Sequence, residues 1–162
     1  KEQIDVLSST LKEFKITDKT TVTFADLGDD DFAQTVNNTI TFNNKVLRNK
    51  EITNKVLNDD NYLASTDISG IAIHEAGHII SRKYGEKGIE IAKKAYYNVY
   101  KEEISDEGII GYLRNNISEY SIYKPMGIKK FKEITSEVLA SNYTNPTRFT
   151  TEFIELLKEL AV

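Results

Sequence analysis

The sequence contains no cysteine and only two histidines among its 162 residues, and it holds no long apolar run. Without cysteine, the chain cannot form disulfides, use a thiolate nucleophile or bind zinc through sulfur. A membrane-spanning helix needs about 18 or more apolar residues, and no segment approaches this length, so we expect no membrane span. Lys1 to Thr10 also lack the apolar core of a signal peptide. Because the chain begins with Lys rather than Met, we interpret it as a processed form or as part of a longer protein.

Length and composition favour one globular domain over residues 1–162. Hydrophobic residues make up 40% and charged residues 28%, as in ordinary globular proteins, and a chain of this length buries a substantial core. The formal net charge of −4 argues against a nucleic-acid partner, because nucleic-acid binders are normally basic. There is no internal repeat and no linker-like segment. These features leave the oligomeric state and the compartment open.

Hydrophobic periodicity predicts a small N-terminal β-element followed mostly by helix. Strand segments are rich in β-branched and aromatic residues, as in TITFN at 39–43, whereas later segments repeat with the helical period. The predicted elements are a helix at 3–15, strands at 20–27 and 39–43, an irregular helix with a loop at 44–63, and helices at 66–85, 88–104, 106–116, 128–141 and 146–160. The expected fold class is therefore α+β and mostly helical.

Two of these helices carry clear start signals. Thr66 or Asp67 is expected to cap the helix at 66–85, because short polar side chains accept hydrogen bonds from the first turn. Asn145 is expected to cap the last helix, with Pro146 at its first position. The acidic run at 28–31 is interpreted as a solvated turn that ends the first strand.

The segment His74-Glu75-Ala76-Gly77-His78 is an H-E-x-x-H pentad, and it contains both histidines of the chain. Residues four apart lie one turn apart on the same face of a helix, so both imidazoles can reach one ion. Zinc accepts such neutral nitrogen ligands in tetrahedral geometry. Glu75 lies about 100° around the helix from His74, where it can take a proton from a zinc-bound water. The alternative interpretation is an ordinary exposed helix in which the two histidines have this spacing by chance.

A catalytic zinc site needs a third protein ligand and one open position. Because the chain has no further His and no Cys, that ligand must be a carboxylate. Ser81 and Tyr84 stand where the metzincin extension requires Gly and His, which excludes that class. The downstream candidates are Glu90, Glu102, Glu103, Asp106, Glu107, Glu119, Glu133 and Glu137.

Glu133 and Glu137 stand apart from the other carboxylates, which mostly belong to solvated charge clusters. They are spaced i, i+4 in a segment whose neighbours Phe131, Ile134 and Val138 are apolar. One of the two can therefore bind the metal while the other accepts the second N–H of a ligating histidine. Two solvent-facing glutamates on an amphipathic helix are the alternative interpretation, and Glu119 is the next candidate ligand.

The combination of HEAGH (74–78), ISEYS (117–121) and FKEITSEVLA (131–140) resembles the metallopeptidase domain of anthrax lethal factor and its relatives. These relatives include the Pro-Pro endopeptidases and the metallopeptidase-like domains of phage and mobile-element proteins. The resemblance covers residues 67–142 and departs from the family in two places. Ser136 stands where the family usually has Ala, and a small insertion lies around residues 124–127.

The resemblance implies a zincin-like domain of the gluzincin type, with a glutamate as third ligand. It implies Glu133 as the zinc ligand, Glu137 as the carboxylate behind the ligating histidine, and Tyr120 as a phenol that assists the transition state. Tyr123 competes with Tyr120 for this role. The strand at 39–43 would match the family's substrate-aligning edge strand.

We therefore expect a zinc-dependent endopeptidase with Zn²⁺ as cofactor, acting on a peptide or protein substrate. Zinc polarises the scissile carbonyl, and Glu75 moves the proton from water to the leaving amine. A second hypothesis is a non-catalytic zinc-binding structural or interaction module of a phage-head or mobile-element protein. A zinc hydrolase acting on a non-peptide amide is a third, weaker hypothesis. Secretion and association with a phage or mobile element are both compatible with the resemblance.

Overall fold

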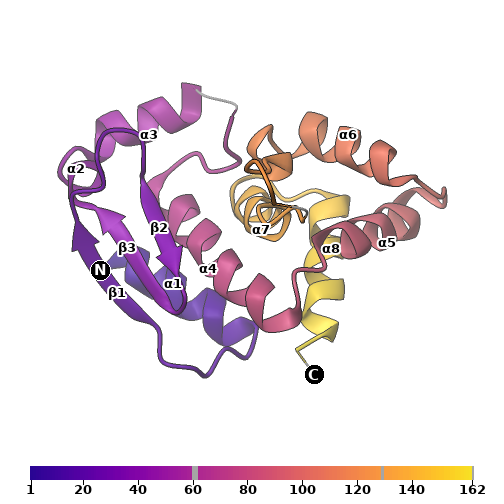
Figure 1. Ribbon diagram of the computed structural model, residues 1–162, viewed down its shortest axis with the longest axis horizontal. Helices are drawn as coiled ribbons and strands as arrows, with labels where there is room; N and C mark the ends of the chain where they lie inside the picture. The colour runs from indigo at the N-terminus through magenta and orange to yellow at the C-terminus, as the bar shows by residue number, and fades with distance from the viewer. Residues whose placement is uncertain (60–61, 129, 162) are drawn as a thin grey trace.

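The N-terminal part of the chain forms a small sheet with a helix behind it. Figure 1 shows the computed structural model, which describes residues 1–59, 62–128 and 130–161. Helix α1 (Glu2–Glu13) buries Leu7 and Leu11 at helical spacing, so the predicted opening helix is confirmed. Strand β1 (Thr21–Ala25) lies within the predicted segment, and β3 (Thr39–Asn43) has the predicted bounds.

Strand β2 (Ala33–Val36) was not among the predicted elements. It joins β3 through the two residues Asn37 and Asn38, and Asn37 adopts a positive φ of 54°, which asparagine tolerates in tight turns. The strand order is β1-β3-β2, with β3 parallel to β1 and antiparallel to β2. The expectation that Thr39–Asn43 is an edge strand is therefore wrong. Hydrogen-bonded neighbours occupy both of its sides, and β2 forms the edge instead.

The segment after the sheet forms two helices rather than one irregular helix. Helix α2 (Asn44–Arg48) begins at Asn43, whose side chain accepts a hydrogen bond from the N–H of Lys45, and helix α3 (Lys50–Asp59) follows. Residues 60 and 61, which belong to the loop predicted in this segment, lie outside the described residues.

Helix α4 (Ile68–Tyr84) is the central element and carries the H-E-x-x-H pentad. Asp67 caps it by accepting a hydrogen bond from the N–H of Gly70, and Gly85 ends it in the left-handed conformation that glycine adopts without a Cβ penalty. Both ends agree with the prediction. The helix is buried along most of its length and contacts α1, β2 and α7.

The C-terminal half is helical, with corrections at two helix starts. The elements are α5 (Gly88–Tyr100), α6 (Asp106–Asn116), the 3₁₀ turn η1 (Tyr120–Ile122), α7 (Ile134–Thr144) and α8 (Arg148–Glu159). Helix α7 does not begin at residue 128, because Gly127 has a φ of 82° and the N–H of Ile128 closes a turn onto Pro125. Lys129, within the predicted helix, lies outside the described residues.

The start of α8 also differs from the prediction. Thr147, rather than Asn145, is its N-cap, and Arg148, rather than Pro146, is its first residue. The hydroxyl of Thr147 accepts the N–H of Thr150, and the hydroxyl of Thr150 accepts the N–H of Thr147. This reciprocal capping box satisfies two backbone donors at once, whereas Asn145 ends α7.

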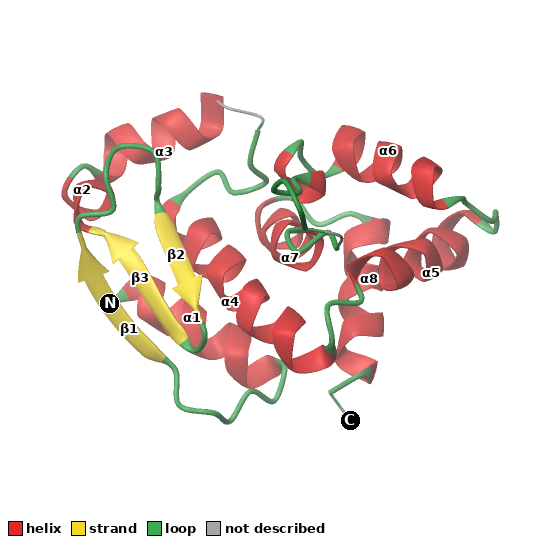
Figure 2. Cartoon of the chain, in the orientation of Figure 1, coloured by secondary structure: helices red, strands yellow, loops and turns green. Residues whose placement is uncertain are grey.

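The fold class is α+β: the described residues form eight α-helices and one three-stranded sheet, and 59% of these residues are helical. Figure 2 shows the sheet on one side of α4, and helices α5 to α8 on the other side. Helix α4, which carries the pentad, thus lies between the sheet and helices α5 to α8. Among the described residues, no helix has the length and apolar character needed to cross a membrane.

Candidate metal centre

The two histidines of the pentad meet on one face of α4. Their rings lie 4.9 Å apart between centroids and are nearly perpendicular. The Nε2 atoms of His74 and His78 are 3.2 Å apart. His74 is buried, and the side chain of His78 is 25% exposed. The helical spacing therefore places both imidazoles at one point, with solvent access on the side of His78.

Glu133, from the N-terminal end of α7, completes a triangle with these two nitrogens. Its Oε2 atom lies 3.3 Å from Nε2 of His74 and 3.4 Å from Nε2 of His78. Three ligand atoms held about 2.0–2.1 Å from one zinc ion in tetrahedral geometry lie about 3.3–3.4 Å from one another. The three observed separations agree with this value. In the part of the chain that the structure describes, these residues form the one group that could hold a metal ion.

The Oε2 atom of Glu133 gives a second test of whether a metal fits. It is buried and makes no hydrogen bond of good geometry, which is costly for a carboxylate oxygen removed from water. A divalent cation inside the triangle would be the missing partner. The donor set of two imidazole nitrogens and one carboxylate oxygen is one that zinc accepts.

Glu137 lies behind His74 and contacts the other nitrogen of its ring. Its fully buried carboxylate accepts hydrogen bonds from Nδ1 of His74 at 2.6 Å, from the N–H of Ala64 at 2.7 Å and from the hydroxyl of Ser118 at 2.5 Å. Because the proton of the neutral imidazole then stays on Nδ1, the lone pair of Nε2 points into the triangle. Glu137 is therefore placed to support a ligand rather than to be one.

The charges at the site depend on one another. Burial by itself would lower the pKa of His74, but the carboxylates of Glu133 and Glu137 outweigh it and hold this pKa well above its ordinary value. Burial and the nearby His74 lower the pKa of His78. Burial opposes ionisation of Glu133, yet the two histidines keep its pKa below the usual value. The two carboxylates thus favour the positively charged form of His74.

Glu75, the acidic residue of the pentad, stays outside the triangle and faces the sheet. Its carboxylate is buried, and its Oε2 accepts a hydrogen bond of 2.5 Å from the hydroxyl of Thr35 in β2. Glu75 nevertheless lines cavities on both sides of the histidines. A buried carboxylate beside a candidate metal site, open to a cavity, is suited to accept a proton.

Two cavities flank the triangle formed by His74, His78 and Glu133. One, of ≈ 390 Å³, extends toward the N-terminal half of α4 and is lined by Tyr62, Leu63 and Ile71 together with His74 and Glu75. The other, of ≈ 420 Å³, extends toward the C-terminal half and is lined by Gln34, Ser81, Arg82, Lys132 and the triangle itself. The rim of the first cavity includes Asp30 and Asp31, from the run interpreted as a solvated turn.

Tyr120 lines both cavities, whereas Tyr123 lines only the first. The centroid of the Tyr120 ring lies 5.8 Å from that of the His74 ring, and Tyr120 stacks on Tyr123 at 5.2 Å between centroids. The backbone N–H of Tyr120 donates a hydrogen bond to the carbonyl of Tyr62. Burial and the carboxylate of Glu133 raise the pKa of Tyr120 far above its ordinary value. Its phenol therefore keeps its proton and remains a hydrogen-bond donor at neutral pH.

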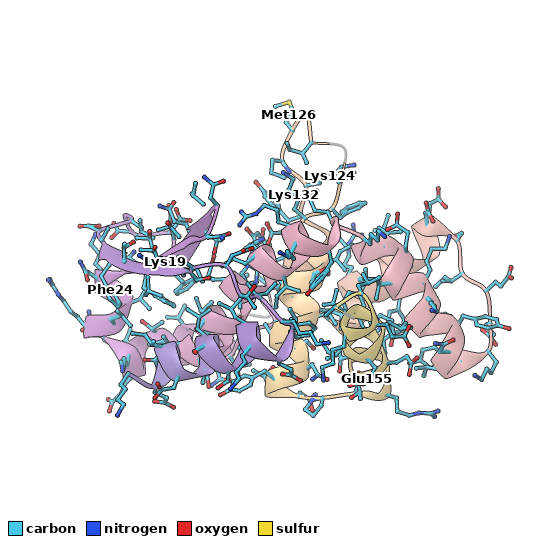
Figure 3. The ribbon with its side chains drawn as sticks, turned by 90° about the horizontal axis from the view of Figure 1, so that it is seen from below. Lys19, Phe24, Lys124, Met126, Lys132 and Glu155 are labelled. Atoms are coloured by element: carbon cyan, nitrogen blue, oxygen red, sulfur yellow. The ribbon has the colours of Figure 1, made fainter. Side chains whose placement is uncertain are left out.

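Residues 124–127, where the resemblance implies a small insertion, belong to a projecting loop beside the cavities. Figure 3 shows Met126 at the tip of this loop, with Lys124 and Lys132 nearer its base. The Met126 side chain is fully exposed. The loop connects Tyr123, at the first cavity, to Lys132 and Glu133, at the second.

The close packing of α4 on α7 depends on a glycine within the pentad. A Cβ atom on Gly77 would lie 2.5 Å from the Cα and 2.7 Å from the Oγ of Ser136. Contacts of this length are not tolerated, so only glycine permits this approach. The approach brings Glu133 and Glu137, on either side of Ser136, against the histidines of α4.

The residues of the triangle were among the candidates predicted from the sequence, but two supporting side chains, Ser118 and Thr35, were not predicted. Ser118 lies in the quoted ISEYS segment, yet its hydrogen bond to Glu137 had no sequence signal. Thr35 was missed because strand β2 was missed. Two short strand-like runs separated by Asn37-Asn38 are a hairpin signal, and this could have revealed β2. Glu119, the alternative ligand, is exposed and lies outside the triangle.

The chain was compared with protein families, curated proteins and solved structures. No family model, no curated protein and no solved structure matches the chain.

Proposed function

We propose that this protein is a zinc-dependent endopeptidase with a zincin-like domain of the gluzincin type. The observation that supports it most is the triangle of Nε2, Nε2 and Oε2 atoms, with sides of 3.2, 3.3 and 3.4 Å. These sides match the ligand separations expected around a tetrahedral zinc ion. His74, His78 and Glu133 would hold the metal, and these residues also line the cavities.

Glu75 is the proposed general base. When bound, zinc supplies a Lewis acid that polarises a carbonyl and lowers the pKa of water. Glu75 lies beside the triangle without belonging to it, so its carboxylate can take a proton from water and return it to the leaving amine. Glu137 holds the ring of His74, and the Tyr120 hydroxyl donates a hydrogen bond to the oxyanion that develops on the scissile carbonyl.

The proposed substrate is an extended peptide that pairs with the open edge of β2. This strand borders α4 and contributes Ala33, Gln34 and Thr35 to the second cavity. Pairing with a sheet edge positions a peptide through its main chain, whatever its sequence. Because cavities extend from the triangle in both directions along α4, the peptide can continue on both sides of the metal, which favours endopeptidase over exopeptidase activity.

The sequence motifs support the same proposal. The three segments that resemble the lethal factor group contribute His74, Tyr120 and Glu133, and the fold brings all three to one place. The zincin-like assignment thus rests on a shared pattern of residues and on the geometry in which they meet.

The proposal is tested by measuring zinc and peptide cleavage in matched variants. Wild type is expected to contain about one zinc per chain and to cleave members of a peptide library. Glu75→Gln should keep the zinc and lose cleavage by about two orders of magnitude or more. Glu133→Gln should lose zinc as well, whereas Glu119→Gln, an exposed carboxylate near the site, should match wild type in both measurements.

Three results would contradict the proposal. Wild type purified without chelators that neither contains nor binds zinc would remove the metal centre. Cleavage by Glu75→Gln at the wild-type rate would remove the base. Tight zinc binding without turnover of any peptide would instead favour the non-catalytic zinc-binding module.

A further inference from the structure

The hydrogen bond between Thr35 and Glu75 joins two elements that carry different parts of the proposed chemistry. Thr35 lies in β2, Glu75 lies in α4, and 40 residues separate them. The Thr35 hydroxyl donates to Oε2 of Glu75 at 2.5 Å and also lies 3.3 Å from the Glu75 carbonyl. The bond occupies one carboxylate oxygen, so the lone pairs of Oε1 stay available to take a proton.

The strand ladder shows what the backbone of Thr35 does at the same time. The N–H of Asn43 donates to the carbonyl of Phe32, and residues paired in an antiparallel ladder alternately face toward and away from the partner strand. In the observed register, Gln34 pairs with Thr41 and Thr35 with Ile40. Gln34 therefore directs its backbone groups to β3, and Thr35 directs its N–H and C=O to the open edge.

Side-chain directions along β2 complete the arrangement. Ala33 and Thr35 are half-buried, and Gln34 and Val36 are exposed, as the twofold period of a strand requires. The half-buried residues thus face α4, where the hydroxyl of Thr35 meets Glu75. One residue offers its main chain to the open edge and its side chain to the acidic residue of the pentad.

We propose that Thr35 is a positioning residue that holds the general base Glu75 in register with a substrate strand bound to β2. This inference rests on the endopeptidase function proposed above. A peptide paired with the backbone of Thr35 has its scissile bond set relative to β2, and the hydroxyl sets the Glu75 carboxylate relative to the same residue. The Thr35 side chain therefore fixes the distance between Glu75 and the substrate. Without it, this distance would depend only on how strand β2 and helix α4 pack against each other.

The test compares Thr35→Val, which removes the hydroxyl and keeps the branched shape, with Thr35→Ser, which keeps the hydroxyl. Thr41→Val is the matched control, because Thr41 shares a 2.8 Å hydroxyl–hydroxyl hydrogen bond with Thr23 in the same sheet and does not touch Glu75. Zinc content, thermal stability, kcat and KM are measured for each variant on one cleaved peptide.

Thr35→Val is expected to lower kcat by about tenfold to a hundredfold, with zinc content unchanged and KM within about twofold, since the main chain that binds substrate is kept. Thr35→Ser should restore kcat to within about threefold of wild type, and Thr41→Val should behave as wild type. A wild-type kcat in Thr35→Val, equal losses in the Val and Ser variants, or loss of zinc from Thr35→Val would each overturn the assignment. If wild type with full zinc cleaves no peptide, the proposed function itself fails, which is a different result.

Discussion

Nδ1 of His74 and Oε1 of Glu137 lie 2.6 Å apart although 63 residues separate them in the chain. This contact fixes the ring of a candidate metal ligand from behind, and the hydroxyl of Ser118 and the N–H of Ala64 fix the carboxylate in turn. All three neighbours are donors, so the site requires a group at position 137 that only accepts.

Glu137→Gln should therefore weaken zinc binding and destabilise the fold. A glutamine must turn its NH₂ group toward at least one of the three donors, which leaves that donor unsatisfied. We expect zinc affinity to fall about tenfold to a hundredfold and the free energy of unfolding to fall by about 1–3 kcal/mol. Competition with a chromogenic chelator and urea unfolding measure the two effects, with the exposed Glu119→Gln as control. Zinc affinity within twofold of wild type would show that this carboxylate does not support the ligand.

Replacing each candidate tyrosine with phenylalanine should separate their roles. Tyr120 lines both cavities, whereas Tyr123 lines one and is 44% exposed. Tyr120→Phe removes only the hydroxyl and should lower kcat by about 10²-fold, as expected for loss of an oxyanion donor. Tyr123→Phe should change kcat little. The opposite order of effects would assign the role to Tyr123, and zinc content should be unchanged in both variants.

Gly77→Ala should disturb the contact between α4 and α7. The new Cβ would meet the backbone of Ser136, so we expect a loss of about 1–3 kcal/mol in the free energy of unfolding and weaker zinc binding as Glu133 is displaced. Gly111→Ala in α6 is the matched control, because no atom lies within 4 Å of its new Cβ. That control should be neutral or more stable by about 0.5–1 kcal/mol. Equal stability of the two variants, measured by urea unfolding, would contradict the close approach.

Zinc should stabilise the protein more at high pH than at low pH. In the metal-free protein the pKa of His74 is raised by Glu133 and Glu137, above a value of about 6.5 in the unfolded chain. The resulting stability is fully present below that pH and is lost as pH rises through the raised pKa. Zinc needs the neutral ring and must displace this proton.

The increase in Tm produced by zinc, relative to the protein with chelator, should therefore be larger at pH 8 than at pH 6. Zinc binding at pH 6 should also release about one proton per chain into a weakly buffered solution. A zinc-dependent Tm shift that is the same at both pH values, with no proton release, would contradict a protonated His74 in the metal-free site.

Much of the helical structure followed from local patterns. Asp67 and Gly85 delimit α4 as predicted, because a cap and a left-handed glycine act within one turn of the helix. The starts of α7 and α8 did not follow, because a positive φ at Gly127 and the capping box of Thr147 and Thr150 displaced the expected boundaries. Strand β2 was not predicted, and the edge of the sheet was therefore assigned to β3 instead of β2.

By itself, the sequence determined that His74 and His78 share one face of a helix and that a third ligand to any metal held there must be acidic, because helical spacing and residue chemistry are local properties. Only the tertiary structure decided that Glu133 rather than Glu137 or Glu119 faces both Nε2 atoms, and that β2 rather than β3 is the open edge. These outcomes depend on how closely α7 approaches Gly77 and on the order of strands in the sheet. Both arise from contacts between segments far apart in the chain, which no local pattern records.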